Sequence, residues 1–134
     1  MKIRISWLVV LLISTVCCNR GSGQNSRTYK LSSGKQIKVN GVARMNFPNG
    51  DSALVMNYET EISIENKQAL RKEVDEIWSI FRKDVEKAEV NAGVIRATHY
   101  EGSGLIRTGK GYGFVYVKGD GGKWLVLDDE NGKK

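Results

Sequence analysis

One long amphipathic segment, residues 67–91, constrains the fold of this chain more than any other feature. Asn66 precedes it as a residue type that caps helices, and Gly93 follows shortly after its end. Apolar residues recur within the segment at spacings of three and four, which predicts a helix that buries one face in the core. They are Leu70, Val74, Ile77, Phe81, Val85 and Ala88, with Trp78 and Ile80 widening the stripe.

Two stretches before this helix alternate apolar and polar residues, as half-buried strands do. The first covers residues 36–47 and the second covers residues 52–64. Pro48–Asp51 between them is a turn sequence, so we expect a β-hairpin.

In the first of these strands the alternation places the apolar residues on a single face. Gly41 falls on that face and predicts a bulge or a sharp bend. The apolar residues expected to share the core face are Ile37, Val39, Ala43, Met45 and Phe47.

After the helix, four short apolar stretches separated by glycine-rich turns predict a four-strand meander. They cover residues 94–100, 105–108, 112–118 and 123–128. We therefore expect an α+β fold in which one long helix packs on a curved antiparallel sheet, built from the hairpin and the meander. This element order resembles that of the cystatin-like, NTF2-like and hotdog groups. The helix sequence ALRKEVDEIWSIFRKDVEKA also resembles small exported bacterial proteins of unknown function, which bring no catalytic motif.

The N-terminus has the pattern of a secretory signal. Lys2 and Arg4 precede an apolar run over residues 5–16, which is shorter than the roughly 20 residues of a membrane-spanning helix. We expect residues 1–18 to be a signal peptide, 19–27 a flexible linker, 28–130 a single domain and 131–134 a loose tail. The mature protein is then exported, and is periplasmic, secreted or anchored to the membrane by lipid.

Cys17 and Cys18, which end the apolar run, are the two cysteines of the chain. A cysteine in this place resembles the lipid-attachment site of bacterial lipoproteins, although neither residue has the full motif before it. Cleavage after Cys17 or Gly23, which would release a soluble protein, is the alternative. Because no cysteine follows, the domain has no internal disulfide, thiolate metal site or cysteine nucleophile.

The octapeptide KGYGFVYV, residues 110–117, resembles the base-stacking motif of RNA-recognition domains. Tyr112, Phe114 and Tyr116 share one face of the predicted strand, but Val117 stands where the motif has an aromatic residue. The chain after it is too short for the second helix of that fold. The net charge of +6 is scattered along the chain and does not by itself indicate nucleic acid.

Other lookalike motifs fail on their context. Residues 104–111 have phosphate-loop spacing but end in Gly111 and precede a strand, so they do not predict a nucleotide site. His99 is the single histidine, and with Glu101 it would be a candidate general base without a visible nucleophile. Asp128–Gly132 is acidic but lacks the spacing of a calcium loop. We expect no catalytic residue, no metal and no cofactor.

These observations favour an exported, non-enzymatic binding module of the cell envelope. It would bind another protein or a small apolar ligand on its sheet, and meet the membrane only through a lipid anchor. The residues expected to form this surface are Trp78, Tyr112, Phe114, Tyr116 and Trp124. The alternatives are a small enzyme or ligand carrier with a pocket between helix and sheet, and RNA or single-stranded DNA binding through residues 110–117.

Overall fold

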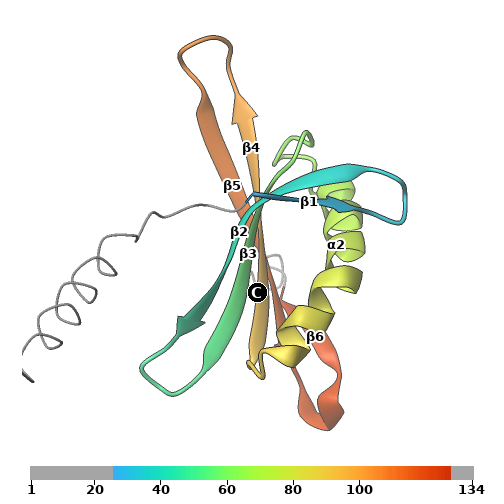
Figure 1. Cartoon of the computed structure of the whole chain (residues 1–134), viewed down its shortest axis with the longest axis vertical. Helices are drawn as coiled ribbons and strands as arrows, with labels where there is room; N and C mark the ends of the chain where they lie inside the picture. The colour runs from blue at the N-terminus through green and yellow to red at the C-terminus, as the bar shows by residue number, and fades with distance from the viewer. Residues whose placement is uncertain (1–25, 128–134) are drawn as a thin grey trace, which may run out of the picture.

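The computed structural model describes residues 26–127, which form six β-strands and one α-helix (Figure 1). The strands are β1 (Arg27–Lys30), β2 (Gln36–Asn46), β3 (Ser52–Glu59), β4 (Ala92–Glu101), β5 (Thr108–Lys118) and β6 (Trp124–Leu127). The helix, α2 (Lys67–Lys87), lies between β3 and β4 in the chain. Within these residues no helix is long and apolar enough to cross a membrane.

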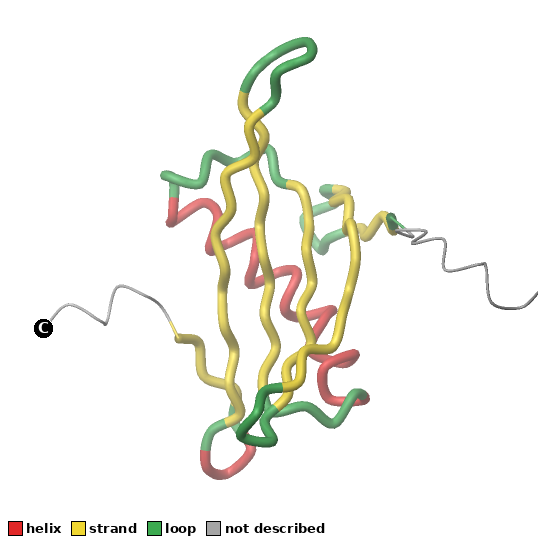
Figure 2. Tube along the Cα trace, turned by 90° about the vertical axis from the view of Figure 1, so that its left-hand side faces the viewer, coloured by secondary structure: helices red, strands yellow, loops and turns green. Residues whose placement is uncertain are grey.

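The six strands form one sheet and lie in it in chain order. Neighbouring strands run antiparallel except β3 and β4, which run parallel because α2 returns the chain to the other end of the sheet. The α+β class with one helix on a sheet is confirmed, whereas a fully antiparallel sheet is wrong at this pair. Helix α2 covers one face only, and the sheet is not closed, with β1 and β6 at its edges (Figure 2). We call the face turned away from α2 the outer face.

Several element boundaries differ from those expected from the sequence. Residues 105–107 form a loop and Thr108 begins β5, so the meander after α2 has three strands rather than four. Gly102 and Gly104 in this loop have φ values of 108° and 70°, which regular strand geometry excludes. β1 is an additional strand, paired with the start of β2. β3 ends at residue 59 rather than 64.

Helix α2 begins and packs as its sequence predicts. Asn66 accepts a hydrogen bond from the Ala69 amide at 3.2 Å, which satisfies one of the free amides at the helix start. The helix ends at Lys87, four residues before the expected end, and Glu89 then adopts a φ of 53° that a helix excludes. The residues buried on its inner side are Leu70, Glu73, Val74, Ile77, Phe81 and Val85.

A β-bulge in β2 reverses the side on which the later residues of that strand lie. The pairing of β2 with β3 shifts register between Val39 and Gly41, which confirms the bulge predicted at Gly41. One extra residue moves every following side chain to the opposite face. Arg44 accordingly faces α2, where its Nη1 donates to the Ala88 carbonyl at 3.1 Å. The expectation that Ala43 and Met45 face the core is wrong, because they pair with Val55 and Ala53 on the outer face. Phe47, one residue beyond β2, continues the same alternation, so the expectation fails for it too.

Gly93, near the start of β4, allows α2 to approach the sheet closely. A Cβ atom at this position would lie 2.6 Å from Trp78 Cζ3 and 3.1 Å from Val85 Cγ2. We expect Gly93→Ala to lower the free energy of unfolding by about 1–3 kcal/mol, because the Trp78 ring or the backbone must shift. Gly113→Ala is the matched control, since its nearest neighbour would be Arg96 Cγ at 3.9 Å. Urea unfolding of the two variants measures the difference, and equal stabilities would contradict this packing.

Candidate functional site

The five residues predicted to form a binding surface lie together between α2 and the sheet. The Trp78 ring stacks on the Tyr116 ring, with centroids 3.9 Å apart and planes 5° apart, and meets Trp124 edge-on at 5.2 Å. Phe114 and Tyr116 are buried, with 3% and 2% of their surface exposed. Tyr112 is half-buried, and Lys67 Nζ lies 3.1 Å from its ring centroid. The structure therefore gathers these side chains beside α2, with Phe114 and Tyr116 buried and Trp78, Tyr112 and Trp124 half-buried.

This placement bears on the nucleic-acid alternative. Base stacking requires aromatic rings on an open face of a sheet. Tyr112, Phe114 and Tyr116 do share a face, as predicted, but α2 lies over that face. The side of β5 that remains open carries Gly109, Gly111 and Gly113 and offers no ring.

The outer face instead carries an exposed apolar surface at one end of the sheet. The face is found from the strand pairing, because paired residues point to the same side. Met45, Phe47, Leu125 and Leu127 on it each expose between 43% and 55% of their surface. We name this surface the outer apolar patch, and its paired members are Ala43, Met45, Ala53, Val55, Ala92, Val94, Val115, Val117, Leu125 and Leu127. Phe47, one residue beyond β2, is counted with them because its amide donates to the Asp51 carbonyl and continues the hairpin. Ala53 and Val55 form the floor of the patch and are themselves buried. The patch spans five strands. It lies on the face that α2 leaves uncovered, and Figure 2 shows that face of the sheet in front of the helix.

The other half of the outer face is polar. Lys38 of β2 and Glu59 of β3 form an ion pair there, with Nζ and Oε1 3.3 Å apart. Three more polar or charged side chains belong to this half of the face. Asn57 and Arg96 pair next to the patch, and Thr98 pairs with Glu59. The outer face is thus divided between an apolar end and a polar end.

The outer apolar patch is not predicted by the sequence pattern, for an identifiable reason. Strict alternation places Ala43, Met45 and Phe47 in the core, because it takes no account of the change of face at the bulge. A usable signal was present at the ends of β5 and β6, where apolar residues occupy both faces. Val115 and Val117 alternate with the core residue Tyr116, and Leu125 and Leu127 alternate with Val126.

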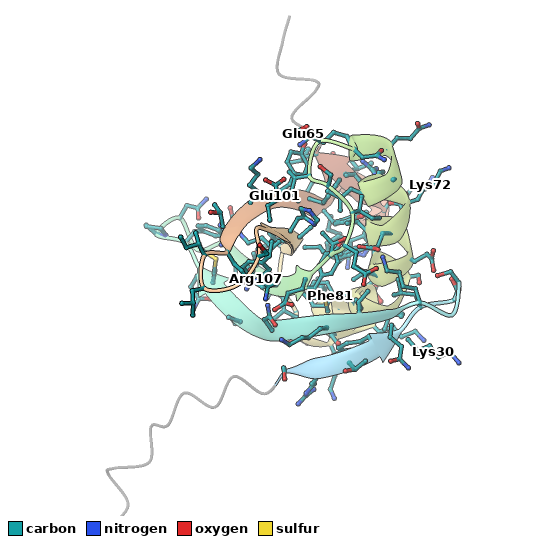
Figure 3. The ribbon with its side chains drawn as sticks, turned by 90° about the horizontal axis from the view of Figure 1, so that it is seen from above. Lys30, Glu65, Lys72, Phe81, Glu101 and Arg107 are labelled. Carbon is teal, nitrogen blue, oxygen red and sulfur yellow. The ribbon has the colours of Figure 1, made fainter. Side chains whose placement is uncertain are left out.

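A groove of about 440 Å³ opens at the polar end of the sheet. Figure 3 views the molecule from this end, with Glu101 and Arg107 of the β4–β5 hairpin labelled. The groove is lined by Lys35, Gln36, Lys38, Glu59, Thr60, Glu61, His99, Tyr100 and Arg107. Its lining contains both cations, Lys35, Lys38 and Arg107, and carboxylates, Glu59 and Glu61. Charges of both signs give the groove no strong preference for ligands of one charge.

The polar groups around this groove are joined by hydrogen bonds and an ion pair. His99 Nδ1 lies 3.0 Å from the Thr60 carbonyl, and the Thr60 hydroxyl donates to Glu73 Oε1 at 2.6 Å. Glu73 is buried on α2, and its other oxygen accepts from Lys35 Nζ at 2.5 Å. The buried carboxylate therefore has a cation and a hydroxyl as partners, which offsets the cost of its burial. This arrangement stabilises the junction of α2 with the sheet.

The gap between α2 and the sheet near β1 does not form a ligand pocket. It is lined by apolar side chains and leaves no room for a water molecule. Its lining consists of Tyr29, Leu31, Ile37, Met56, Ile77 and Ile80. The alternative that placed a pocket with several polar groups between helix and sheet therefore finds no support here.

Two further sequence expectations concern metal and lipid. Within residues 26–127, no group of three or more histidine, cysteine or acidic side chains is arranged to hold a metal ion. Cys17 and Cys18 lie outside the described residues, as do the signal peptide and Asp128–Gly132. Lipid attachment and export stay predictions from the sequence.

Comparison with known proteins gave no match. No protein-family model, no curated protein and no solved structure matches the chain significantly. The resemblance of residues 69–88 to small exported proteins, and that of the element order to the cystatin-like group, stay predictions.

Tyr58 makes the stability of the fold depend on pH. Its ring is fully buried, and within residues 26–127 its hydroxyl has no partner at good hydrogen-bond geometry, although Glu73 and Thr60 lie near enough to influence it. Burial, together with the Glu73 carboxylate, raises the pKa of Tyr58 well above its ordinary value of 10.0. The unfolded chain therefore releases this proton near pH 10, while the folded chain keeps it. The stabilisation of the folded state by protonated Tyr58 is complete below pH 10 and is lost progressively above it.

We expect the free energy of unfolding to fall above pH 10 by up to about 1.4 kcal/mol per pH unit from this group. Tyr58→Phe should reduce this slope and leave stability at pH 7 within about 1 kcal/mol, because the hydroxyl is unpaired. Tyr100→Phe, at a partly exposed position, should keep the full slope. Chemical unfolding from about pH 8 to about pH 11, a range that spans the ordinary tyrosine pKa of about 10, measures all three proteins. Equal slopes would contradict the assignment to Tyr58.

Proposed function

We propose that this protein is an exported, non-enzymatic binding module of the cell envelope that engages another protein through its outer apolar patch. The observation that carries the proposal is the exposure of Met45, Phe47, Leu125 and Leu127 on a sheet face that α2 does not cover. Soluble proteins seldom expose a contiguous apolar surface of this kind unless it meets a partner.

The shape of the patch favours a protein over a small apolar ligand. Small ligands bind in concave pockets that bury most of their surface. The outer apolar patch extends over five strands, and the 440 Å³ groove lies at the other, polar end of the sheet. An extended, shallow apolar surface with a polar border is the form that protein interfaces take.

The contacts of His99 bear on the non-enzymatic part of the proposal. A general base acts through a free ring nitrogen within reach of substrate, oriented by its other nitrogen. Here Nδ1 faces the main-chain carbonyl of Thr60, and the neighbouring Glu73 is held by Lys35 and Thr60. The Thr60 carbonyl would also orient a general base, so the support for a non-enzymatic role is that, among the described residues, no hydrogen bond joins His99 to a nucleophile.

A photo-reactive amino acid placed in the patch tests the proposed surface. Incorporated at Val115, in the middle of the patch, it should form a covalent adduct with the partner in the cells that make the protein. Incorporated at Lys83, on the exposed side of α2, it should give none above background. The adduct at Val115 should be lost when Leu125→Lys and Leu127→Lys are added. Absence of an adduct at Val115, or equal adducts at both positions, would contradict the proposal.

Export is tested separately by the intact mass of the protein in membrane and soluble fractions. A membrane form that starts at Cys17 or Cys18 and carries added acyl mass would establish lipid anchoring. A soluble form that starts after the apolar run would establish release by cleavage. A full-length form confined to the cytosol would show the export prediction to be wrong.

A further inference from the structure

The size of the outer apolar patch matches the centre of a dimer interface. Its five strands lie about 4.8 Å apart, and the two or three outward residues of each strand lie about 6.7 Å apart, which gives an area on the order of 400 Å². Each partner in a stable dimer buries roughly 800 Å². The apolar core of such an interface occupies its middle, and a polar rim supplies the remainder.

The sizes of the side chains across the patch allow two copies to interdigitate. Its larger side chains stand at its two sides, Met45 and Phe47 at the end of β2 and Leu125 and Leu127 on β6. Between these two ridges lie alanine and valine residues of β3, β4 and β5, of which Ala53 and Val55 are already buried, at 1% and 4% exposed. A two-fold axis placed off the centre of the patch would set one ridge of each copy against the smaller residues of the other.

The charge distribution is also compatible with self-association. In a two-fold symmetric contact each residue meets itself or a symmetry-related residue, so a charge at the centre would meet its like. The patch contains no charged side chain, and Arg96 and the Lys38–Glu59 pair lie outside it on the same face. These charges would lie in the solvated rim, where water and salt screen them.

We propose that a second copy of this chain covers the outer apolar patch, so that two sheets pack face to face about a two-fold axis. The inference rests on the proposed function and names the partner at the same surface. Sheets packed in this way lie about 10 Å apart, with strand directions within about 30° of each other. The α2 helices would then form the outer layers of a four-layer dimer.

Light scattering coupled to size-exclusion chromatography, on the protein as the cell processes it, tests the dimer. From about 1 to about 100 µM, the range of moderate self-association, the molar mass should approach twice that of the chain. Leu125→Lys with Leu127→Lys should weaken the dimer at least about tenfold, because two desolvated side chains become charged. Met45→Lys, on the opposite ridge, should have the same effect. A monomer at the highest concentration would overturn the inference.

Leu105→Lys with Ile106→Lys is the matched control. These two residues are equally apolar and highly exposed, but they lie in the β4–β5 loop away from the patch. They should leave the dimer unchanged, and an equal loss in this variant would overturn the assignment to the patch. Thermal unfolding of each variant establishes that it is folded. A dimer that dissociates when salt is raised would also overturn the inference, since an apolar contact does not weaken with salt.

The cross-linking experiment at Val115 separates this inference from the proposed function. An adduct between two copies of the chain supports both. An adduct with a different protein, together with a monomeric mass in solution, overturns the second-copy inference and leaves the proposed function standing. Absence of any adduct overturns both.

Discussion

The packing of α2 against one face of the sheet is the contact on which the rest of the structure depends. Trp78 lies at its centre, stacked on Tyr116 and edge-on to Trp124, and Gly93 leaves the space that this ring needs. The described domain has one helix and a two-faced sheet, so only one face can be covered. The outer apolar patch is the direct consequence of that shortage.

The two ends of the molecule are stabilised by different interactions. At the polar end, α2 holds the turn between β1 and β2 through carboxylates: Glu73 accepts from Lys35, and Glu76 accepts from the Ser33 amide at 3.0 Å. At the other end, Arg44 donates to the last turn of α2, where a cation also meets the negative end of the helix dipole. Polar contacts thus fix the orientation of the helix, and apolar burial supplies most of the stability.

The candidate surface was less predictable than the fold. Periodicity identified α2 and its buried face, because a stripe of 3.6-residue period depends only on local sequence. Within the predicted aromatic surface, Phe114 and Tyr116 are instead buried under α2. An aromatic strand has the same alternation whether its face is open or covered, so the sequence does not distinguish the two cases. Residues 105–108 show a similar limit: Leu105 and Ile106 are apolar, yet glycines with positive φ turn the chain there into an exposed loop.

The sequence by itself determined the helix, its cap at Asn66, the hairpin before it and the α+β class, because each depends on residues close together in the chain. Only the tertiary structure decided which faces those elements present. The bulge at Gly41 sends Met45 to the outer face, and the crossover of α2 makes β3 and β4 parallel. The sheet face on which a side chain lies, and the relative direction of two strands, are set when distant segments pair. Local periodicity does not encode either of them.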